Sequence, residues 1–306
     1  MESGNNNTLT FKTIADLTER MYLPVPLHPL VTLINYDTIK PNLKDAGNWV
    51  TLDFYKISFK NDFKGSVKYG PNRYDFKEGG LAFLAPGQSV EIPSQTADYQ
   101  GFVLYFHPDI LRGHPLAQHI FRFGFFDYCV TEALFLSDNE KRIITTLFEA
   151  IGTELHNPTD TYSQDILLSQ IELLLNHSNR FYNRQFITRK VLHHDLIDRM
   201  NNYLLQHFST GKALHSGLPS AHDLAVYLNV SQRYLSDMLR TLTGKTTQQY
   251  IHLLIIDQAK QMLNQKALTT AEIAYQLGFE HPQSFNKLFK QKTGLSPAMF
   301  KQRRST

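Results

Sequence analysis

Cysteine is nearly absent from this chain of 306 residues, because Cys129 is the only one. A single thiol excludes an internal disulfide and is typical of proteins in a reducing cytosol. No apolar run approaches the roughly 18 residues that a membrane-spanning helix requires. The opening MESGNNNTLT is polar and predicts a short leader without fixed structure. These features predict a soluble cytoplasmic protein that has no membrane partner.

Histidine is missing from the whole segment between Pro29 and Phe106. From about 48 to 106 the chain alternates short β-branched and aromatic runs with glycine and proline, which predicts a small sandwich or jelly-roll barrel. Strands without imidazole cannot assemble the usual two- or three-histidine metal site. We therefore expect a barrel that holds no metal and no cofactor and performs no catalysis.

The interior of such a barrel is a natural pocket for a small molecule. By strand alternation Tyr55 shares a face with Ile57 and Phe59, while Tyr69 and Tyr105 each share one with the valine two positions earlier. A tyrosine hydroxyl can orient a polar ligand, so Tyr55, Tyr69 and Tyr105 are the candidate effector-binding residues. Aromatic residues at period two are also ordinary core packing, and both interpretations stay open.

The last third of the chain contains one short pattern twice, at 221–244 and 270–294. Aligning the copies pairs Leu224 with Ile273, Ala225 with Ala274, Leu228 with Leu277, Leu239 with Phe289 and Gly244 with Gly294. Each copy predicts a helix, a tight turn and a second helix. This is the helix-turn-helix unit, whose second helix can enter the DNA major groove. A plain helical hairpin in a bundle would show a similar apolar pattern.

Residues that favour helix ends stand at the expected positions in both copies. Ser220 with Asp223, and Thr269 with Glu272, have the spacing of capping boxes. Asn229 and Gly278 are turn residues that accept positive φ. Ser231 and Pro282 suit the starts of the second helices, and Gly244 and Gly294 suit their ends. Between the copies, 246–265 lacks Gly and Pro and predicts one long helix. Twenty helical residues span roughly 30 Å, close to the roughly 34 Å between successive major-groove faces.

Residues 195–304 resemble the DNA-binding domain of the AraC/XylS family of bacterial transcription regulators. The family's usual ending appears as FKQKTGLSPAMFKQRR from Phe289 to Arg304. Two positions depart from the family pattern, since Ile255 stands where the linker helix commonly has Arg and Asp237 replaces a basic residue in the first recognition helix. An acidic side chain there would repel phosphate and could only accept a hydrogen bond from a base such as cytosine.

The face of each recognition helix opposite its apolar core supplies the candidate DNA contacts. These are Gln232, Arg233, Ser236, Asp237 and Arg240 in the first helix, and Gln283, Asn286, Lys287 and Lys290 in the second. Arg suits guanine and Gln or Asn suits adenine, whereas Arg240 and Lys290 at the far ends suit phosphates. The charge agrees weakly, because 13 basic and 7 acidic residues follow position 190, against 18 and 21 before it.

The resemblance extends, on a looser pattern, to the cupin-like sensor domain of the same family, best in KYGPNRYDFKEGGLAFLAPGQ at 68–88. Amphipathic helices are expected at 137–157 and 160–184. The apolar face of the second carries Ile166, Leu167, Ile171, Leu174 and Leu175 and could pack on its own barrel or form an isologous dimer seam. The resemblance favours dimerisation. The stretch 181–190 is polar and basic without a periodic core, so the domain joint is placed near it.

The expected fold class is α+β with two domains. A cupin-like effector-binding and dimerisation domain spans 1–185, and an AraC-type DNA-binding domain spans 186–306, with helix-turn-helix units at about 220–244 and 269–294 joined by a helix at about 245–265.

The resemblance implies a homodimeric regulator that binds promoter DNA, senses a small-molecule effector and contacts RNA polymerase. An effector would act through differential affinity for two arrangements of the protein. Two other functions remain open: a barrel enzyme with an appended regulatory helical domain, and a module for protein–protein interaction.

Overall fold

The computed structural model describes residues 8–38, 48–64, 66–69, 72–75, 79–91, 98–265 and 268–303. The chain divides into two compact units, Met1–Gln185 and Phe186–Thr306. The first unit contains all the strands among these residues, and the second is built from helices. This is the α+β, two-part architecture that the sequence predicts.

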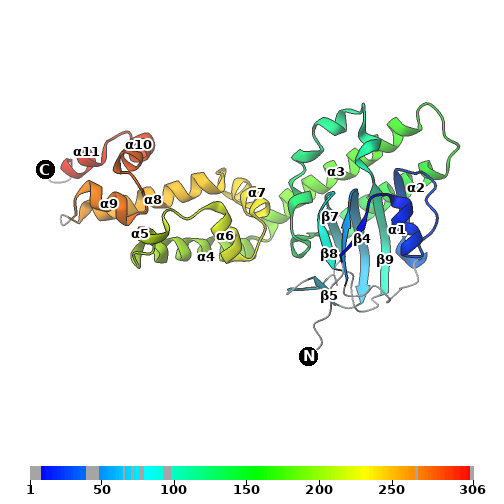
Figure 1. The fold of residues 1–306 in the computed structure, drawn as a ribbon, viewed down its shortest axis with the longest axis horizontal. Coiled ribbons are helices and arrows are strands. Elements are labelled where there is room, and N and C mark those ends of the chain that lie inside the picture. Colours follow the sequence, from blue (N-terminus) through cyan, green and yellow to red (C-terminus); the bar gives the residue numbers. More distant parts are fainter. Residues whose placement is uncertain are drawn as a thin grey trace. The chain divides into compact units, whose positions relative to one another are not determined.

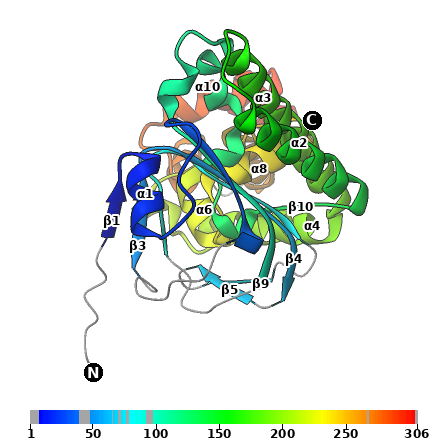
Figure 2. The ribbon, with the colours of Figure 1, turned by 90° about the vertical axis from the view of Figure 1, so that its right-hand side faces the viewer.

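The first unit has ten strands in its described part. They are β1 (Thr8–Phe11), β2 (Val31–Asn35), β3 (Trp49–Leu52), β4 (Tyr55–Lys64), β5 (Ser66–Tyr69), β6 (Asn72–Asp75), β7 (Gly80–Leu84), β8 (Ser89–Glu91), β9 (Asp98–Phe106) and β10 (Leu134–Phe135). One sheet has the order β1-β3-β8, a larger one has the order β10-β7-β4-β9-β2, and β5 pairs with β6. The first two sheets form the two sides of a sandwich (Figure 2).

The core between these sheets draws on both of them and on α1 (Ile14–Arg20). It contains Phe11, Ile14, Leu17, Ile34, Val50, Leu52, Phe54, Val103 and Tyr105, all buried. Ile34 is paired with Val103 across β2 and β9, and residues paired in this way point to the same face. The register therefore identifies which side chains of the larger sheet face the sandwich interior.

The other face of the larger sheet is covered by α2 (Asp138–His156) and, through intervening 3₁₀ turns, by α3 (Ser163–Thr188). The ring of Phe148 in α2 stacks on Phe59 and Phe102, with centroid distances of 5.8 and 5.6 Å. The ring of Tyr182 in α3 stacks on Phe125, with a centroid distance of 5.6 Å. Because both faces of this sheet are covered, the alternation of side chains along its strands does not separate a solvent-exposed face from a buried one.

The second unit contains the predicted helix-turn-helix pair. Its helices are α4 (Lys190–Ser209), α5 (Ala213–Ser216), α6 (Ala221–Leu228), α7 (Gln232–Thr243), α8 (Thr247–Asn264), α9 (Thr270–Gln276), α10 (Pro282–Thr293) and α11 (Pro297–Gln302). Within this unit α6 and α7 pack at one end of α8, and α9 and α10 pack at the other (Figure 1). The predicted linker helix at 245–265 is thus confirmed as α8. Ile255, the departure from the family pattern, is fully buried in it.

The predicted helix ends are confirmed in both copies. Ser220 and Thr269 form reciprocal capping boxes with Asp223 and Glu272. Asn229 has a φ of 57° at the first turn. Gly278 takes φ 89° at the second, and the closing glycines Gly244 and Gly294 are also left-handed. These local preferences explain why two segments with different side chains adopt the same geometry.

Two segments differ from the sequence-based expectation. Part of the polar opening is not loose, because Thr8–Phe11 forms β1 and pairs in parallel with β3; residues 1–7 lie outside the described part. The stretch at 181–190 does have a periodic core, since 181–188 belong to α3 and Phe181, Tyr182 and Phe186 are buried. Along α3, Leu167, Ile171, Leu174 and Leu175 are buried, whereas Ile166 is exposed.

Replacing Gly278 with alanine should destabilise the protein more than replacing Gly244. Both glycines have positive φ, which costs about 1–2 kcal/mol for an L residue. A Cβ on Gly278 would lie 2.7 Å from the Gly217 carbonyl carbon, whereas nothing lies within 4 Å of one on Gly244. We expect Gly278→Ala to lose at least about 1 kcal/mol more than Gly244→Ala, because the backbone must also shift. Urea unfolding of both variants measures this difference, and equal losses would contradict it.

Candidate nucleic-acid interface and effector site

The apolar side of the first recognition helix, α7, is buried and holds the helix in the domain. Tyr234, Leu235, Met238 and Leu239 are buried, and the Ser231 side chain accepts a hydrogen bond from the Tyr234 N–H at the helix start. The opposite face carries all five predicted contact residues. Gln232 and Arg240 are exposed, and Arg233, Ser236 and Asp237 are half-buried. The structure therefore brings these five side chains onto one polar face of α7.

An ion pair lies in the middle of this face. Arg233 Nε is 3.0 Å from Asp237 Oδ2, one helical turn away, and the two side chains are 40% and 22% exposed. The contact uses only one of the five guanidinium N–H groups, so the terminal nitrogens retain donors for a base edge. Asp237 thus holds the guanidinium in one orientation and also places negative charge on the face. Sequence alone did not reveal this pairing.

Residues at the start of α4 contact the buried side of α7. His193 is 2% exposed and its Nδ1 donates to the Phe186 carbonyl at 2.8 Å. Its Nε2 lies 3.1 Å from the Tyr234 hydroxyl, which can donate to it. Burial lowers the pKa of His193, with smaller opposing and assisting effects from the Phe186 carbonyl and from Arg189. A neutral imidazole therefore links α4 to the buried side of the recognition helix.

The second recognition helix, α10, has the same arrangement with a more basic surface. Phe285 and Phe289 are fully buried, and their rings contact Phe279 and Phe300 at centroid distances of 5.5 Å in each case. All four predicted contact residues are exposed on the outer side: Gln283, Asn286, Lys287 and Lys290. Pro282 occupies the first turn. No charge inside this set opposes binding to phosphate.

Two of the candidate effector tyrosines, Tyr55 and Tyr105, point to different sides of the larger sheet. Tyr55 faces the helical side of the larger sheet, where its ring stacks on Phe106 at 4.8 Å, whereas Tyr105 belongs to the core between the sheets. Burial, with a smaller effect of Asp127, raises the pKa of Tyr55. Tyr69 ends β5, opposite Asn72, and its side chain lies outside the described part. Tyr55 and Tyr105 therefore lie on opposite faces of the larger sheet.

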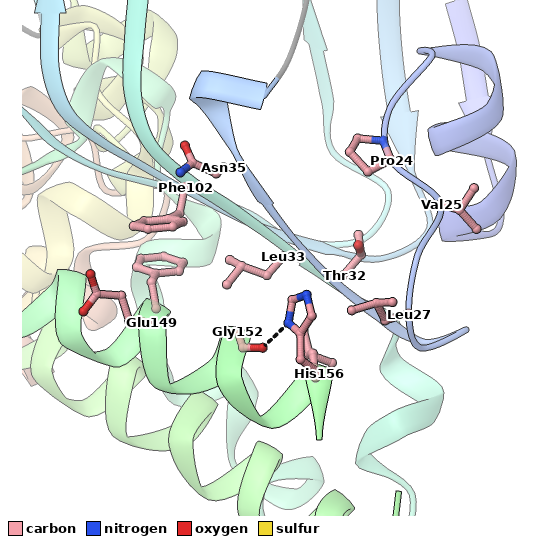
Figure 3. Close-up of a pocket in the computed structure, with 12 residues that line it drawn as sticks. Pro24, Val25, Leu27, Thr32, Leu33, Asn35, Phe102, Glu149, Gly152 and His156 are labelled. Carbon is pink, nitrogen blue, oxygen red and sulfur yellow. Dashed lines mark hydrogen bonds between the residues drawn. The ribbon is translucent and has the colours of Figure 1, made fainter. Parts of the chain in front are cut away.

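A pocket of about 350 Å³ lies on the helical side of β2 (Figure 3). Its lining is mainly apolar and comes from the 24–27 segment, β2, β9 and α2: Pro24, Val25, Leu27, Thr32, Leu33, Asn35, Phe102, Phe148, Glu149, Gly152, Leu155 and His156. His156 Nδ1 donates to the Gly152 carbonyl at 2.7 Å. The pocket offers a ligand few groups of fixed charge, and its size suits a small molecule.

The sandwich interior has a different chemistry, which sequence reasoning missed. Lys56, Ser58 and Lys60 are paired with Tyr105, Val103 and Gly101, so they face the interior. Alternation correctly grouped Tyr55, Ile57 and Phe59, but it gave no sign that the lysines of β4 point inward. The sequence carries no signal for this orientation, because the pairing of Lys60 with Gly80 and Gly101 is known only from the structure.

Within the described ranges, no three histidine, cysteine, aspartate or glutamate residues gather in a way that would hold a metal ion. Among the same residues, no helix has the length and apolar character needed to cross a membrane.

Comparison with known proteins gives two domain matches. A model of the AraC-like ligand binding domain matches residues 53–171, and a model of a helix-turn-helix domain matches residues 224–303. The raffinose operon transcriptional regulatory protein RafR of Pediococcus pentosaceus is 28% identical over 147 residues, 48% of this chain and 50% of that protein. The transcriptional activator RhaR of Cronobacter sakazakii is 33% identical over 93 residues, 29% of this chain and 33% of that protein.

Among solved structures, the C-terminal domain of the response regulator AraT from Geobacillus stearothermophilus is 26% identical. The match covers 35% of this chain and 84% of that one, with a TM-score of 0.31. The chain matches about half the length of RafR and a third of RhaR. Both domain models nevertheless match in the family's order, sensor first and helix-turn-helix second. The chain therefore belongs to the AraC family of transcription regulators.

Proposed function

We propose that this chain is a sequence-specific transcription regulator of the bacterial cytoplasm, which binds promoter DNA and responds to a small-molecule effector in its first unit. The observation that carries the proposal is the presence of two helix-turn-helix units at opposite ends of α8. The 18 residues of α8 span about 27 Å at about 1.5 Å each. That length suits two recognition helices in successive major-groove segments of one duplex.

The proposed contacts divide into base-reading and phosphate-binding groups. Arg233 suits a guanine, and Gln283 and Asn286 suit adenines, because each can form two hydrogen bonds to the base edge. Lys287 lies beside Asn286 and supplies a further donor. Arg240 and Lys290, nearer the C-terminal ends of α7 and α10, are proposed to hold phosphates and to set the register of the protein on DNA.

The first unit is proposed to sense rather than to catalyse. Effector binding would shift the protein between two arrangements with different affinities for DNA or for RNA polymerase. We also propose a homodimer, for which the exposed apolar residues of α3 are a suitable seam. Ile166 and Leu173 are 43% and 46% exposed and lie two helical turns apart, so they share one face.

Selection of the full-length chain against sheared genomic DNA from its source tests the proposal. Binding at about 50 mM and about 200 mM salt should enrich sites with two half-elements about one helical turn apart. The double variant Arg233→Ala with Lys287→Ala should lose this enrichment, whereas Lys12→Ala, an exposed lysine of the first unit, should keep it. Weak, sequence-independent binding that disappears at the higher salt would contradict a sequence-specific reader and favour a protein partner.

A further inference from the structure

The pocket beside β2 includes the open edge of the larger sheet. Among the described residues the order β10-β7-β4-β9-β2 gives β2 a partner strand on one side only. Thr32 and Leu33 are neighbours in β2, so their side chains point to opposite faces, yet both line the pocket. The pocket therefore follows the edge of the strand, between α2 and the segment 24–27 (Figure 3).

The pairing of β2 with β9 shows which backbone groups point into this edge. The His107 N–H donates to the Leu30 carbonyl at 2.8 Å, which marks a hydrogen-bonded pair of the antiparallel ladder. Such pairs alternate with non-hydrogen-bonded ones, so Leu33, three residues further on and opposite Leu104, belongs to the second kind. Its N–H and C=O point away from β9, and no described residue bonds to either group. The edge thus presents a donor and an acceptor side by side.

Thr32 is a further polar group without a partner. Its side chain is only 5% exposed, and its hydroxyl makes no hydrogen bond within the described part of the chain. Buried hydroxyl groups in proteins are ordinarily paired, because leaving one unpaired costs free energy. A molecule bound in the pocket can supply the missing partner.

The rest of the lining is an apolar surface that the protein itself leaves partly uncovered. Val25 and Leu27 are 87% and 62% exposed although they line the pocket. The half-buried ring of Phe102 lies nearly parallel to the fully buried ring of Phe148, with 5.6 Å between the centroids. A ligand ring can pack on Phe102 in the same way, since aromatic pairs favour such separations. These contacts suit a ligand with an apolar, aromatic body.

The charges around the pocket favour an uncharged ligand. Glu149 carries the only fixed charge among the described lining residues, and it is exposed. An anion would find no lysine or arginine in the lining and would be repelled by this carboxylate. A cation would find a counter-charge only where water screens it. Either charge would lose hydration against the apolar walls without adequate compensation.

We propose that the pocket at the edge of β2 is the effector site, and that the effector is a small, uncharged aromatic compound with a hydrogen-bond donor and acceptor side by side, as in a carboxamide. The polar group would bond to the backbone of Leu33, and the ring would lie against Phe102 and Leu27. This inference rests on the proposed sensor role and specifies both its site and its ligand class.

Calorimetric titration of the full-length protein tests the ligand class with defined probes. Benzamide and naphthalene carboxamide are the uncharged aromatic probes. Benzoate and naphthoate are their anionic counterparts, benzylamine is a cation, and cyclohexanecarboxamide and galactose are uncharged without an aromatic ring. We expect at least one aromatic amide to bind at least about tenfold more tightly than the charged probes and galactose. It should also bind about threefold more tightly than cyclohexanecarboxamide.

The ligand class is wrong if neither aromatic amide binds. It is also wrong if a carboxylate, the amine, galactose or cyclohexanecarboxamide binds as tightly as the better aromatic amide.

A leucine at position 152 tests the location of the site. A Cβ on Gly152 would lie 3.1 Å from Leu33 Cδ2, so the side chain of Gly152→Leu must occupy the pocket between α2 and β2. This variant should bind the amide at least about tenfold more weakly, because the ligand and the new side chain compete for the same volume. Thr153→Leu is the matched control, since it adds a leucine at the next, exposed position of α2, outside the lining. It should bind as the unchanged protein does.

Leu27→Asp tests the same site without disturbing the core, because Leu27 is exposed. A carboxylate in the apolar wall should weaken amide binding at least about fivefold. Tyr22→Asp, at an apolar position that is 74% exposed and outside the lining, should leave binding unchanged. Full affinity in both Gly152→Leu and Leu27→Asp would overturn the assignment of the pocket.

DNA binding without ligand separates this inference from the proposed function. Gly152→Leu and Leu27→Asp change only the first unit, so both should still enrich the same genomic sites as the unchanged chain. Enrichment of sites by an unchanged chain that binds no amide would refute the ligand class and leave the DNA-binding role intact. Amide binding without any enrichment of sites would refute the proposed function instead.

Discussion

Replacing Lys60 with methionine should raise the free energy of unfolding at pH 7. The ammonium group is almost fully buried, and its pKa falls to about 7 because the folded state disfavours the charge. A tenfold change in a proton-binding constant corresponds to about 1.4 kcal/mol, and after allowance for local relaxation we expect a gain on the order of 1–3 kcal/mol. Urea unfolding at pH 7 measures it. Lys12→Met, on the surface, should change little.

The gain should shrink as the pH rises. Between about pH 7, where folded Lys60 loses its proton, and pH 10.5, where an ordinary lysine does, the unfolded chain binds more protons than the folded one. The stability contributed by this group therefore increases with pH over that window, and the unchanged protein approaches the methionine variant. Lys56 acts in the same direction from about pH 8. A methionine variant that is less stable at pH 7 would contradict this account of Lys60.

Replacing Arg233 with alanine should weaken binding to a selected DNA site by about 1–3 kcal/mol, roughly fivefold to 150-fold. The side chain is on the polar face of α7 and retains free donors despite its contact with Asp237. A base-reading residue should lose affinity for the selected duplex much more than for a scrambled one. Fluorescence anisotropy with both duplexes measures the two losses, and equal losses would reassign Arg233 to phosphate.

Asp237→Ala separates the two effects of the acidic residue. Removing its charge should raise affinity for the scrambled duplex, because the repulsion of phosphate disappears. Freeing the Arg233 guanidinium should lower the preference for the selected duplex, because its orientation is lost. Asp257→Ala is the matched control, since it breaks another exposed helical pair, with Lys260 at 3.3 Å, on α8. The same change in both variants would show that only net charge matters.

The helix-turn-helix pair was predictable because its information is local. Capping residues, a left-handed Asn229 and the left-handed glycines fix where each helix starts and ends, whatever surrounds it. The strands from β4 to β9 were predictable for the same reason, since glycine or proline separates each of them from the next. Both depend on contacts that reach only a few residues along the chain.

The inner face of the sandwich was not predictable in this way. Alternation along β4 separates Tyr55, Ile57 and Phe59 from the lysines, but it does not say which group faces the other sheet. In most sheets the lysines would lie on the solvent-exposed face. In this protein the lysines face the other sheet, because helices cover the face that carries the aromatic residues of β4. The end of α3 and the first strand were missed because their partners are distant in sequence, as β1 is from β3.

The backbone of Gly278 lies against that of Gly217. The turn of the second helix-turn-helix unit therefore packs directly against the loop that precedes the first unit. Together with α8, this contact fixes the two units as one body with a set angle between their outer faces. On DNA such a body is sensitive to helical phase. One added base pair between half-elements turns the second by about 34° and moves it about 3.4 Å along the axis. In the proposed DNA-binding role, such a body would measure a fixed interval between the two half-elements, in addition to identifying the bases at each end.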